Sequence, residues 1–501
     1  MLKSTSHTLQ TFFSSKPLSI NIFFCYNILE IGSDYMLKPD YKVAKDRTKV
    51  EIKYQNIDEK IKNIYDGKKY FLRTYGCQMN VHDSEAIASY LEKLGFVKTD
   101  VLENSDVVVL NTCAIRENAH DKVFGYLGRC KHLKKEKTDL IIVLMGCMAG
   151  QEDVVEEIEK NHKYVDIVIG PNNLFDLPHL LIEKLDKQNI LVHSNSDIVP
   201  EGFSYKRDSK VSAWVNVMFG CDKFCTYCIV PFTRGRERSR KMEAILEECK
   251  CLVKSGYKEI TLLGQNVNAY GNDLNLGYDF ADLLEGVAKL GIPRLRFVTS
   301  HPWNFTDKMI DIIAKYKNVM PYIHLPIQSG SDKILKKMNR KYTKKQYITL
   351  FNKMKEKIPN VCITTDIIVG FPGETNEDFE ETLDIVNKLK YDGAYTFIYS
   401  ERKGTASSFM KDDVTIKEKE ERLHRLNELV NKYSKESNEK LINKVVPVLL
   451  IGESEKDKTK CYGYTDTMKL VNVKCDKKEI GNIINVKITD AKSFSLDGKV
   501  E

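Results

Sequence analysis

Three cysteines near the middle of the chain have a spacing suited to metal chemistry. They form the segment Cys221-Asp-Lys-Phe-Cys225-Thr-Tyr-Cys228, so three thiols lie within eight residues. Thiolates are the soft ligands that hold iron–sulfur clusters, and one such loop can wrap three corners of a cubane. Cys249 and Cys251 are a predicted helix away and do not complete the set. We predict a [4Fe–4S] cluster with three protein ligands.

An iron without a protein ligand stays open, as a catalytic metal site keeps a position for substrate. Here it can chelate the amino and carboxylate groups of a methionine moiety. One electron from the cluster would then break the sulfonium–carbon bond and leave a 5′-deoxyadenosyl radical. The alternative is a zinc knuckle, which the spacing and the aromatic Phe224 and Tyr227 disfavour. With this motif the sequence resembles the radical-SAM superfamily, whose cofactor is S-adenosylmethionine.

Small and polar residues follow three other predicted strands, where the adenosyl group could lie. The candidate cofactor contacts are Gln265, Gln328, Ser329, Gly370 and Gly373. Turn formation alone is the alternative explanation of the glycines.

Three further cysteines each follow an apolar run: Cys77 in TYGCQMN, Cys113 in LNTCAIRE and Cys147 in LMGCMAG. In an open parallel sheet the strand ends share one edge, so we expect these thiols to converge there. Three ordinary buried thiols are the alternative. We predict a second cluster with three ligands, and a second open iron suggests sulfur handling rather than electron transfer.

The other cysteines lack such a pattern and are expected to be core or surface thiols: Cys25, Cys130, Cys249, Cys251, Cys362, Cys461 and Cys475. No convincing secretion signal precedes them, which disfavours a disulfide framework. His301 and His324 lie near strand ends and are left unassigned.

The elements that position these residues follow an α/β rhythm. Residues 68–185 alternate short apolar runs with amphipathic stretches, which predicts an open parallel sheet with strands over 70–74, 107–111, 140–145 and 166–169. A polar linker follows, and residues 207–438 repeat the pattern six times. The strands expected there are 213–219, 259–263, 294–298, 322–325, 362–369 and 395–400. Six units predict a partial (β/α)6 barrel with its site at the strand C-terminal ends.

The two ends of the chain differ from this pattern. Residues 441–501 have short alternating runs, at 445–451, 469–473 and 482–488, which predict a small all-β barrel. Residues 1–67 are expected to be an N-terminal extension, largely disordered, and Met36 resembles a second start. The net charge of +7 is compatible with a polyanionic partner. No apolar run approaches the ~20 residues that cross a bilayer, so we expect a cytoplasmic protein.

From about residue 68 to its end the chain resembles the methylthiotransferase family of radical-SAM enzymes. The segments that carry the resemblance are YGCQMNVHDSE, LNTCAIRENA, GCDKFCTYCIVPFTRGRERSR, LLGQNVNAYG, HLPIQSGS and TDIIVGFPGET. The resemblance implies an N-terminal domain with an auxiliary [4Fe–4S] cluster, a radical-SAM barrel and a C-terminal RNA-binding TRAM domain. It also implies that Cys221, Cys225 and Cys228 hold the radical cluster, and that Cys77, Cys113 and Cys147 hold the auxiliary one.

The implied reaction is methylthiolation of N(6)-(dimethylallyl)adenosine at position 37 of tRNA, at carbon 2 of the base. One S-adenosylmethionine supplies the radical, and a second methylates cluster-bound sulfur. The implied partners are tRNA and a low-potential electron donor such as flavodoxin or ferredoxin, and the protein is expected to be a monomer. Gly150-Gln151 departs from the family, which usually has Gln directly after GCMA. That difference lies beyond the ligand.

A basic stretch after the cluster loop gives the RNA side separate support. Residues 231–241 carry Arg234, Arg236, Arg238 and Arg240 as candidate RNA contacts. Arginine pairs with phosphates and stacks on unstacked loop bases. Solvated charges with internal ion pairs are the alternative. The rival functions are methylthiolation of threonylcarbamoyl-adenosine in tRNA, methylthiolation of a ribosomal-protein aspartate, and a non-catalytic cluster protein.

Overall fold

The computed structural model describes residues 51–54, 61–114, 117–184, 190–192, 198–202 and 205–501. All of them belong to one unit of the chain, residues 47–501. Most of the predicted N-terminal extension, including Met36 and Cys25, lies outside the described residues. No described helix is both long and apolar enough to cross a bilayer.

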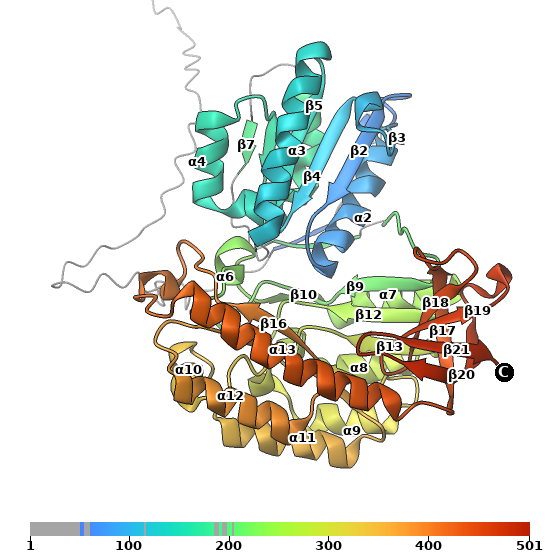
Figure 1. Cartoon of the computed structure of the whole chain (residues 1–501). Coiled ribbons are helices and arrows are strands. Elements are labelled where there is room, and N and C mark those ends of the chain that lie inside the picture. Colours follow the sequence, from blue (N-terminus) through green and yellow to red (C-terminus); the bar gives the residue numbers. More distant parts are fainter. Residues whose placement is uncertain (1–50, 55–60, 115–116, 185–189, 193–197, 203–204) are drawn as a thin grey trace, which may run out of the picture. The chain divides into compact units, whose positions relative to one another are not determined.

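The first domain is a six-stranded parallel sheet in the order β3-β2-β4-β5-β6-β7 (Figure 1). Its strands are β2 (Lys69–Thr74), β3 (Val97–Lys98), β4 (Val107–Thr112), β5 (Ile141–Gly146), β6 (Ile167–Ile169) and β7 (Ile190–Val192). Its helices are α2 (Gln78–Lys93), α3 (Glu117–Glu136), α4 (Glu152–Asn161) and α5 (Leu177–Glu183). Every residue of β4 is buried, as expected of a central strand covered on both faces. The predicted open parallel sheet is confirmed.

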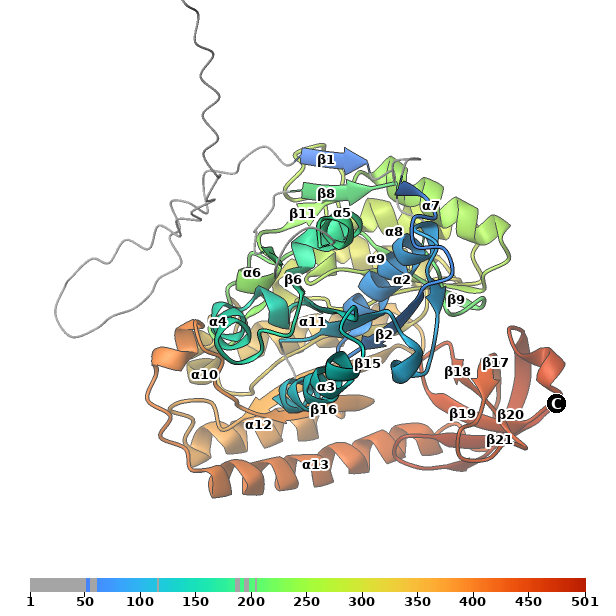
Figure 2. The ribbon, with the colours of Figure 1, turned by 90° about the horizontal axis from the view of Figure 1, so that it is seen from above.

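Two short strands were not anticipated. β1 (Glu51–Tyr54) pairs in parallel with β8 (Ile198–Glu201), and Figure 2 shows the two side by side. Tyr65 is buried against Phe96 and donates a hydrogen bond to the Leu181 carbonyl. The largely disordered extension expected for residues 1–67 therefore includes ordered segments at 51–54 and from 61 onward. Their order comes from partners distant in sequence, which no local pattern reveals.

The central domain contains six parallel strands in two three-stranded sheets, β13-β12-β9 and β14-β15-β16. A bridge between Leu295 and Val319 links the sheets, so the strands follow chain order as a partial barrel. The strands are β9 (Ser212–Asn216), β12 (Glu259–Leu263), β13 (Arg294–Phe297), β14 (Tyr322–His324), β15 (Cys362–Val369) and β16 (Gly393–Ile398). Two short antiparallel strands, β10 (Met218–Phe219) and β11 (Arg238–Ser239), pair with each other on either side of the cluster loop.

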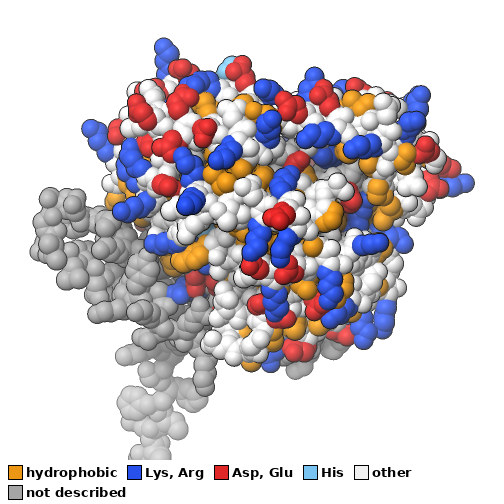
Figure 3. All heavy atoms as spheres, turned by 90° about the horizontal axis from the view of Figure 1, so that it is seen from below, with side chains coloured by type: hydrophobic (Ala, Val, Ile, Leu, Met, Phe, Trp, Pro, Cys, Tyr) orange, Lys and Arg blue, Asp and Glu red, His pale blue; other side chains and the backbone are white. Residues whose placement is uncertain are grey.

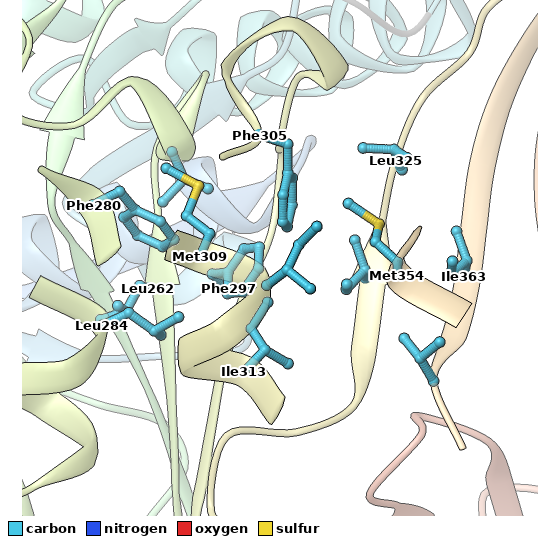
Figure 4. Close-up of a cluster of buried hydrophobic side chains, with 14 of the residues drawn as sticks. Leu262, Phe280, Leu284, Phe297, Phe305, Met309, Ile313, Leu325, Met354 and Ile363 are labelled. Carbon is cyan, nitrogen blue, oxygen red and sulfur yellow. The ribbon is translucent and has the colours of Figure 1, made fainter. Parts of the chain in front are cut away.

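Helices alternate with these strands: α6 (Val230–Thr233), α7 (Met242–Lys254), α8 (Phe280–Ala288), α9 (Asp307–Lys315), α10 (Asp332–Lys337), α11 (Lys344–Lys357), α12 (Asn376–Leu389) and α13 (Ile416–Glu439). Thr343, Thr375 and Thr415 cap the starts of α11, α12 and α13 with capping boxes. The core lies between helices and strands, where Phe280, Phe297 and Met309 pack together (Figure 4).

The C-terminal domain is a closed barrel in the order β17-β18-β19-β21-β20. Its strands are β17 (Val445–Glu453), β18 (Cys461–Thr465), β19 (Leu470–Lys474), β20 (Ile483–Ala491) and β21 (Leu496–Val500). The expected all-β barrel is confirmed, although β18 and β21 were not recognised because Gly463 and Gly498 interrupt their apolar pattern. Arg294 ties this barrel to the central domain by donating to the carbonyls of Tyr464 and Pro447.

Acidic and basic side chains are intermixed on the face shown in Figure 3. Many surface charges of the central domain form ion pairs between helices, among them Lys357 with Asp311 and Arg425 with Glu380. On that face the positive charge is therefore mixed with acidic side chains, and the net charge does not by itself point to an RNA-binding face.

Candidate active site

The Cys221–Cys228 loop follows β10 directly. Gly220 precedes it at φ +73°, and a Cβ there would lie 2.0 Å from the Arg236 carbonyl oxygen. Only glycine allows this approach, which leads into a hydrogen bond from the Cys221 amide to the Gly235 carbonyl. The Cys228 amide donates to the Cys225 carbonyl over 2.9 Å, so the last two thiols share one turn.

The three thiols of this loop lie close enough to influence one another. Burial, with Glu237 and the other two thiols, raises the pKa of Cys221 well above its ordinary value. Burial and the Cys225 thiol raise the pKa of Cys228 to about 12. Three ionised thiols would repel one another here, and positively charged irons would relieve that repulsion. The donor set therefore fits an iron–sulfur cluster.

The second triad is assembled from three separate strand ends. Thr112 and Gly146 are register partners at the ends of β4 and β5, and Cys113 and Cys147 come immediately after them. The Cys147 amide donates to the Thr112 carbonyl over 2.9 Å. Cys77 follows the neighbouring strand β2 and occupies the N-cap of α2. The predicted convergence at one sheet edge is what this topology produces.

A buried asparagine joins the parts of this second triad. Asn80 accepts a hydrogen bond from the Cys77 amide, and its side-chain amide donates to Asn111 and to the Thr112 carbonyl over 3.1 and 3.0 Å. Asn111 in turn donates to the Asn80 carbonyl and to Ser84. Sequence reasoning missed Asn80, although its place in the first turn after Cys77 was a usable signal.

The thiols of the second triad also perturb each other. Burial, followed by the Cys113 and Cys77 thiols, raises the pKa of Cys147 to about 11, while Arg234 opposes this effect. Cys113 and Cys147 are buried and Cys77 is partly exposed. No group of three Cys, His, Asp or Glu side chains among the described residues is placed to hold a single metal ion, but three thiols that perturb one another in a shielded setting fit the donor set of an iron–sulfur cluster.

The arginine candidates need a correction. Arg234 pairs with Asp83, Arg238 donates to Asn172, and Arg240 pairs with Glu201 and Glu248. All three are buried, and their guanidinium groups form hydrogen bonds or ion pairs inside the protein. Their prediction as RNA contacts is therefore wrong. Arg236 differs. Its side chain is 30% exposed and forms a two-pronged pair with Asp222.

Another arginine, absent from the sequence predictions, holds the radical loop. Arg340 is buried, and its Nη1 donates to the Cys225 sulfur over 3.4 Å. Its neighbour Asn339 donates to the carbonyls of Lys223 and Phe224. The segment after α10 therefore binds the cluster loop. The contact joins residues 115 positions apart, so no local motif predicts it.

The five candidate cofactor contacts differ in their hydrogen bonds. The side-chain oxygen of Gln265 is buried and accepts no hydrogen bond from the described residues, which leaves it available to a ligand. Gln328, at φ +75°, bonds through its backbone to β15. Gly370 and Gly373 also have positive φ and donate to Glu374 and Asp413. These contacts support the turn interpretation of the glycines.

Ser329, the remaining candidate, is fully buried. Its hydroxyl accepts a hydrogen bond from the Ser331 amide over 3.2 Å. The Ser329 side chain therefore stabilises the loop before α10.

Two of the other cysteines do converge, contrary to expectation. The sulfurs of Cys461, the first residue of β18, and Cys475, directly after β19, lie 2.6 Å apart in the C-terminal barrel. Antiparallel pairing brings them together across a loop that carries no recognisable cysteine motif.

Comparisons with known proteins agree with these domains. The model of the radical SAM superfamily matches residues 215–386, which include Cys221, Cys225 and Cys228. The model of the uncharacterized protein family UPF0004 matches residues 69–170, which include Cys77, Cys113 and Cys147. The TRAM domain model matches residues 439–500.

Two curated relatives decide the family. A tRNA-2-methylthio-N(6)-dimethylallyladenosine synthase of Staphylococcus epidermidis is 50% identical over 466 residues, 92% of this chain and 91% of the relative. The enzyme of that name from Halalkalibacterium halodurans is 50% identical over 471 residues, 92% of this chain and 87% of the relative. The chain belongs to the family of tRNA-2-methylthio-N(6)-dimethylallyladenosine synthases. The resemblance drawn from the cysteine motifs is thereby confirmed.

Among solved structures, the radical S-adenosylmethionine methyltransferase TsrM from Kitasatospora setae aligns with a TM-score of 0.48 at 14% identity. The alignment covers 66% of this chain and 73% of that one.

Proposed function

We propose that this chain methylthiolates N(6)-(dimethylallyl)adenosine at position 37 of tRNA, at carbon 2 of the base. It would use two S-adenosylmethionine molecules and cluster-bound sulfur. The observation that carries the proposal is the presence of two thiol triads on two domains. One lies in a single loop and the other at three adjacent strand ends. A chain that only generated a radical would need one of them.

The protein's residues have separable tasks in this reaction. When bound, the clusters and S-adenosylmethionine supply the radical, the methyl group and the sulfur. Cys221, Cys225 and Cys228 would hold one [4Fe–4S] cluster, and Cys77, Cys113 and Cys147 the other. The unpartnered oxygen of Gln265 would accept a hydrogen bond from bound S-adenosylmethionine. Burial of most ligand sulfurs would exclude water from reactive species.

The tRNA would contact the central and C-terminal domains. The last barrel strand, β16, exposes Tyr395 and Phe397, which are 59% and 51% accessible. Exposed aromatic faces suit stacking on a base taken out of its loop. Arg236, the accessible member of the arginine set, would meet backbone phosphate, and the TRAM barrel would bind further along the RNA. A flavodoxin or ferredoxin would supply electrons.

The test is anaerobic reconstitution with iron and sulfide, followed by S-adenosylmethionine, reductant and isopentenylated tRNA. Mass spectrometry of the digested nucleosides should show a methylthio group on isopentenyladenosine. Unmodified tRNA lacking the isopentenyl group is the control substrate and should give no product. Methylthio product on threonylcarbamoyl-adenosine or on an aspartyl peptide, with none on isopentenyladenosine, would overturn the assignment.

A further inference from the structure

Each cysteine triad has one buried arginine that donates a hydrogen bond to a ligand sulfur. Arg234 Nε lies 3.1 Å from the Cys147 sulfur, and Arg340 Nη1 lies 3.4 Å from the Cys225 sulfur. Both guanidinium groups are nearly inaccessible, with 4% and 7% of each residue exposed. A cation placed at this distance in a dry setting acts strongly on the charge of a thiolate-bound cluster.

The two arginines differ in how their charge is balanced. Arg234 Nη2 donates to Asp83 Oδ2 over 2.8 Å, and this carboxylate is also buried. The positive charge beside Cys147 is therefore offset by a negative charge on the far side of the same guanidinium. Arg234 also belongs to the central domain while Asp83 and Cys147 belong to the first, so the contact joins the two triads' domains.

Arg340 has no such counter-charge. It donates to the Pro326 carbonyl and to the Tyr342 hydroxyl, and no Asp or Glu among the described residues forms an ion pair with it. The charge of Arg340 acts on a neighbouring side chain: burial, together with Arg340 and Lys223, lowers the pKa of His301 well below its ordinary range. The guanidinium beside Cys225 therefore lacks a paired carboxylate, although Glu237 lies near Cys221, whereas the guanidinium beside Cys147 is half of a neutral pair.

We propose that Arg234 and Arg340 are positioning residues that set the reduction potentials of the two clusters differently, Asp83 being the residue that makes the difference. A nearby cation and a hydrogen bond to sulfur stabilise the more negative, reduced cluster and raise its potential. Arg340 would raise the potential of the Cys221 cluster. Asp83 would cancel most of the same effect of Arg234 at the Cys147 cluster. This inference rests on the two-cluster part of the proposed function.

The experiment measures each cluster alone in the full-length chain. Replacing Cys77, Cys113 and Cys147 with Ala leaves the radical cluster, and replacing Cys221, Cys225 and Cys228 with Ala leaves the auxiliary one. Iron and sulfide analysis first establishes occupancy. Midpoint potentials then come from redox titration followed by electron paramagnetic resonance.

Arg340→Gln and Asp83→Asn are expected to shift the potentials of their clusters in opposite directions. Arg340→Gln should shift the radical cluster to a lower potential, and Arg340→Lys should recover part of the shift. Asp83→Asn, which keeps the shape of the side chain, should shift the auxiliary cluster to a higher potential. Adding Arg234→Gln to Asp83→Asn should return that potential toward the wild-type value, because the cation and its counter-charge leave together.

Arg240→Gln is the matched control. Arg240 is another buried arginine, paired with Glu201 and Glu248, so its loss should reduce stability and leave both potentials unmoved. Unchanged potentials in Arg340→Gln and Asp83→Asn at full occupancy would overturn the inference. Absence of iron from the variant lacking Cys221, Cys225 and Cys228 would instead overturn the two-cluster proposal and the Arg234 part with it.

Discussion

The loop from Cys221 to Cys228 and the triad of Cys77, Cys113 and Cys147 differ in how their thiols are brought together. In the loop, one turn and one glycine suffice, and the ligands are neighbours in sequence. In the second triad, three parallel strands must first pair in register before Cys77, Cys113 and Cys147 come together. The first site depends on local backbone geometry, and the second depends on the folding of a whole sheet.

Because of this difference, different residues hold each triad in place. The loop is held from outside by Asn339 and Arg340, which contact its backbone and one sulfur. The second triad is held from inside by Asn80, which bonds to both Cys77 and the end of β4. Perturbing one holder should leave the other site intact, so the two triads can be separated by mutation.

The largest separation should come from the cysteines themselves. Cys225→Ala should abolish both reductive cleavage of S-adenosylmethionine and methylthiolation, since no radical is formed. Cys147→Ala should abolish methylthiolation while retaining cleavage, measured as 5′-deoxyadenosine by liquid chromatography. Cys251→Ala, at an exposed thiol, is the control and should retain both activities. Loss of cleavage in Cys147→Ala with the radical cluster assembled would mean that the two triads do not act separately.

Asn80→Ala should damage the second triad selectively. It leaves buried groups of Asn111 and Thr112 without their partner, at a cost of about 3 kcal/mol in the free energy of unfolding. Iron content should fall toward that of a single cluster while S-adenosylmethionine cleavage persists. The exposed Asn161, whose side chain donates to Glu157 in its own helix, is the matched control, and Asn161→Ala should change neither quantity. Denaturant unfolding and iron analysis check both variants.

Glycine substitutions compare the backbone at the two sites. Gly220→Ala places a Cβ 2.0 Å from the Arg236 carbonyl, and Gly146→Ala places one 2.4 Å from the Thr112 carbonyl, both at positive φ. Each should cost about 2–4 kcal/mol of stability, and each should lower occupancy of its own cluster.

Gly277→Ala isolates the conformational part of that cost. It has φ +77° with nothing within 4 Å of the added Cβ, so it should cost only about 1 kcal/mol. Equal losses in all three variants, measured by thermal or denaturant unfolding, would show that the close contacts contribute nothing.

The smallest effect concerns RNA. Arg236→Gln should weaken tRNA binding a few-fold and reduce the slope of log affinity against log salt by about one, since one phosphate contact is lost. Cleavage of S-adenosylmethionine without tRNA should persist. Arg238→Gln is the contrast: its side chain is buried, so it should lower stability more than it alters the salt slope. An unchanged affinity for Arg236→Gln in a low-salt gel-shift assay would remove this residue from the interface.

Sequence reasoning succeeded where a pattern is local or repeats along the chain. The alternation of apolar runs and amphipathic stretches predicted the parallel sheet and the six barrel strands. It failed for β1 and β8, whose pairing joins residues 51–54 to 198–201. It also failed for the basic stretch, because composition does not say which charges face inward.

What the amino-acid sequence by itself determined about this protein is the presence of two sets of soft donors: three thiols in one loop and three more behind apolar strands. Three soft donors without a fourth predict an iron–sulfur cluster in which one iron has no protein ligand. Only the tertiary structure decided the surroundings of those ligands. Arg234, a candidate RNA contact in the sequence, is hydrogen-bonded to Cys147 and Asp83 in the structure, and Arg340 is hydrogen-bonded to Cys225. The physical reason is that burial and long-range pairing, not residue type, determine what a charge acts on.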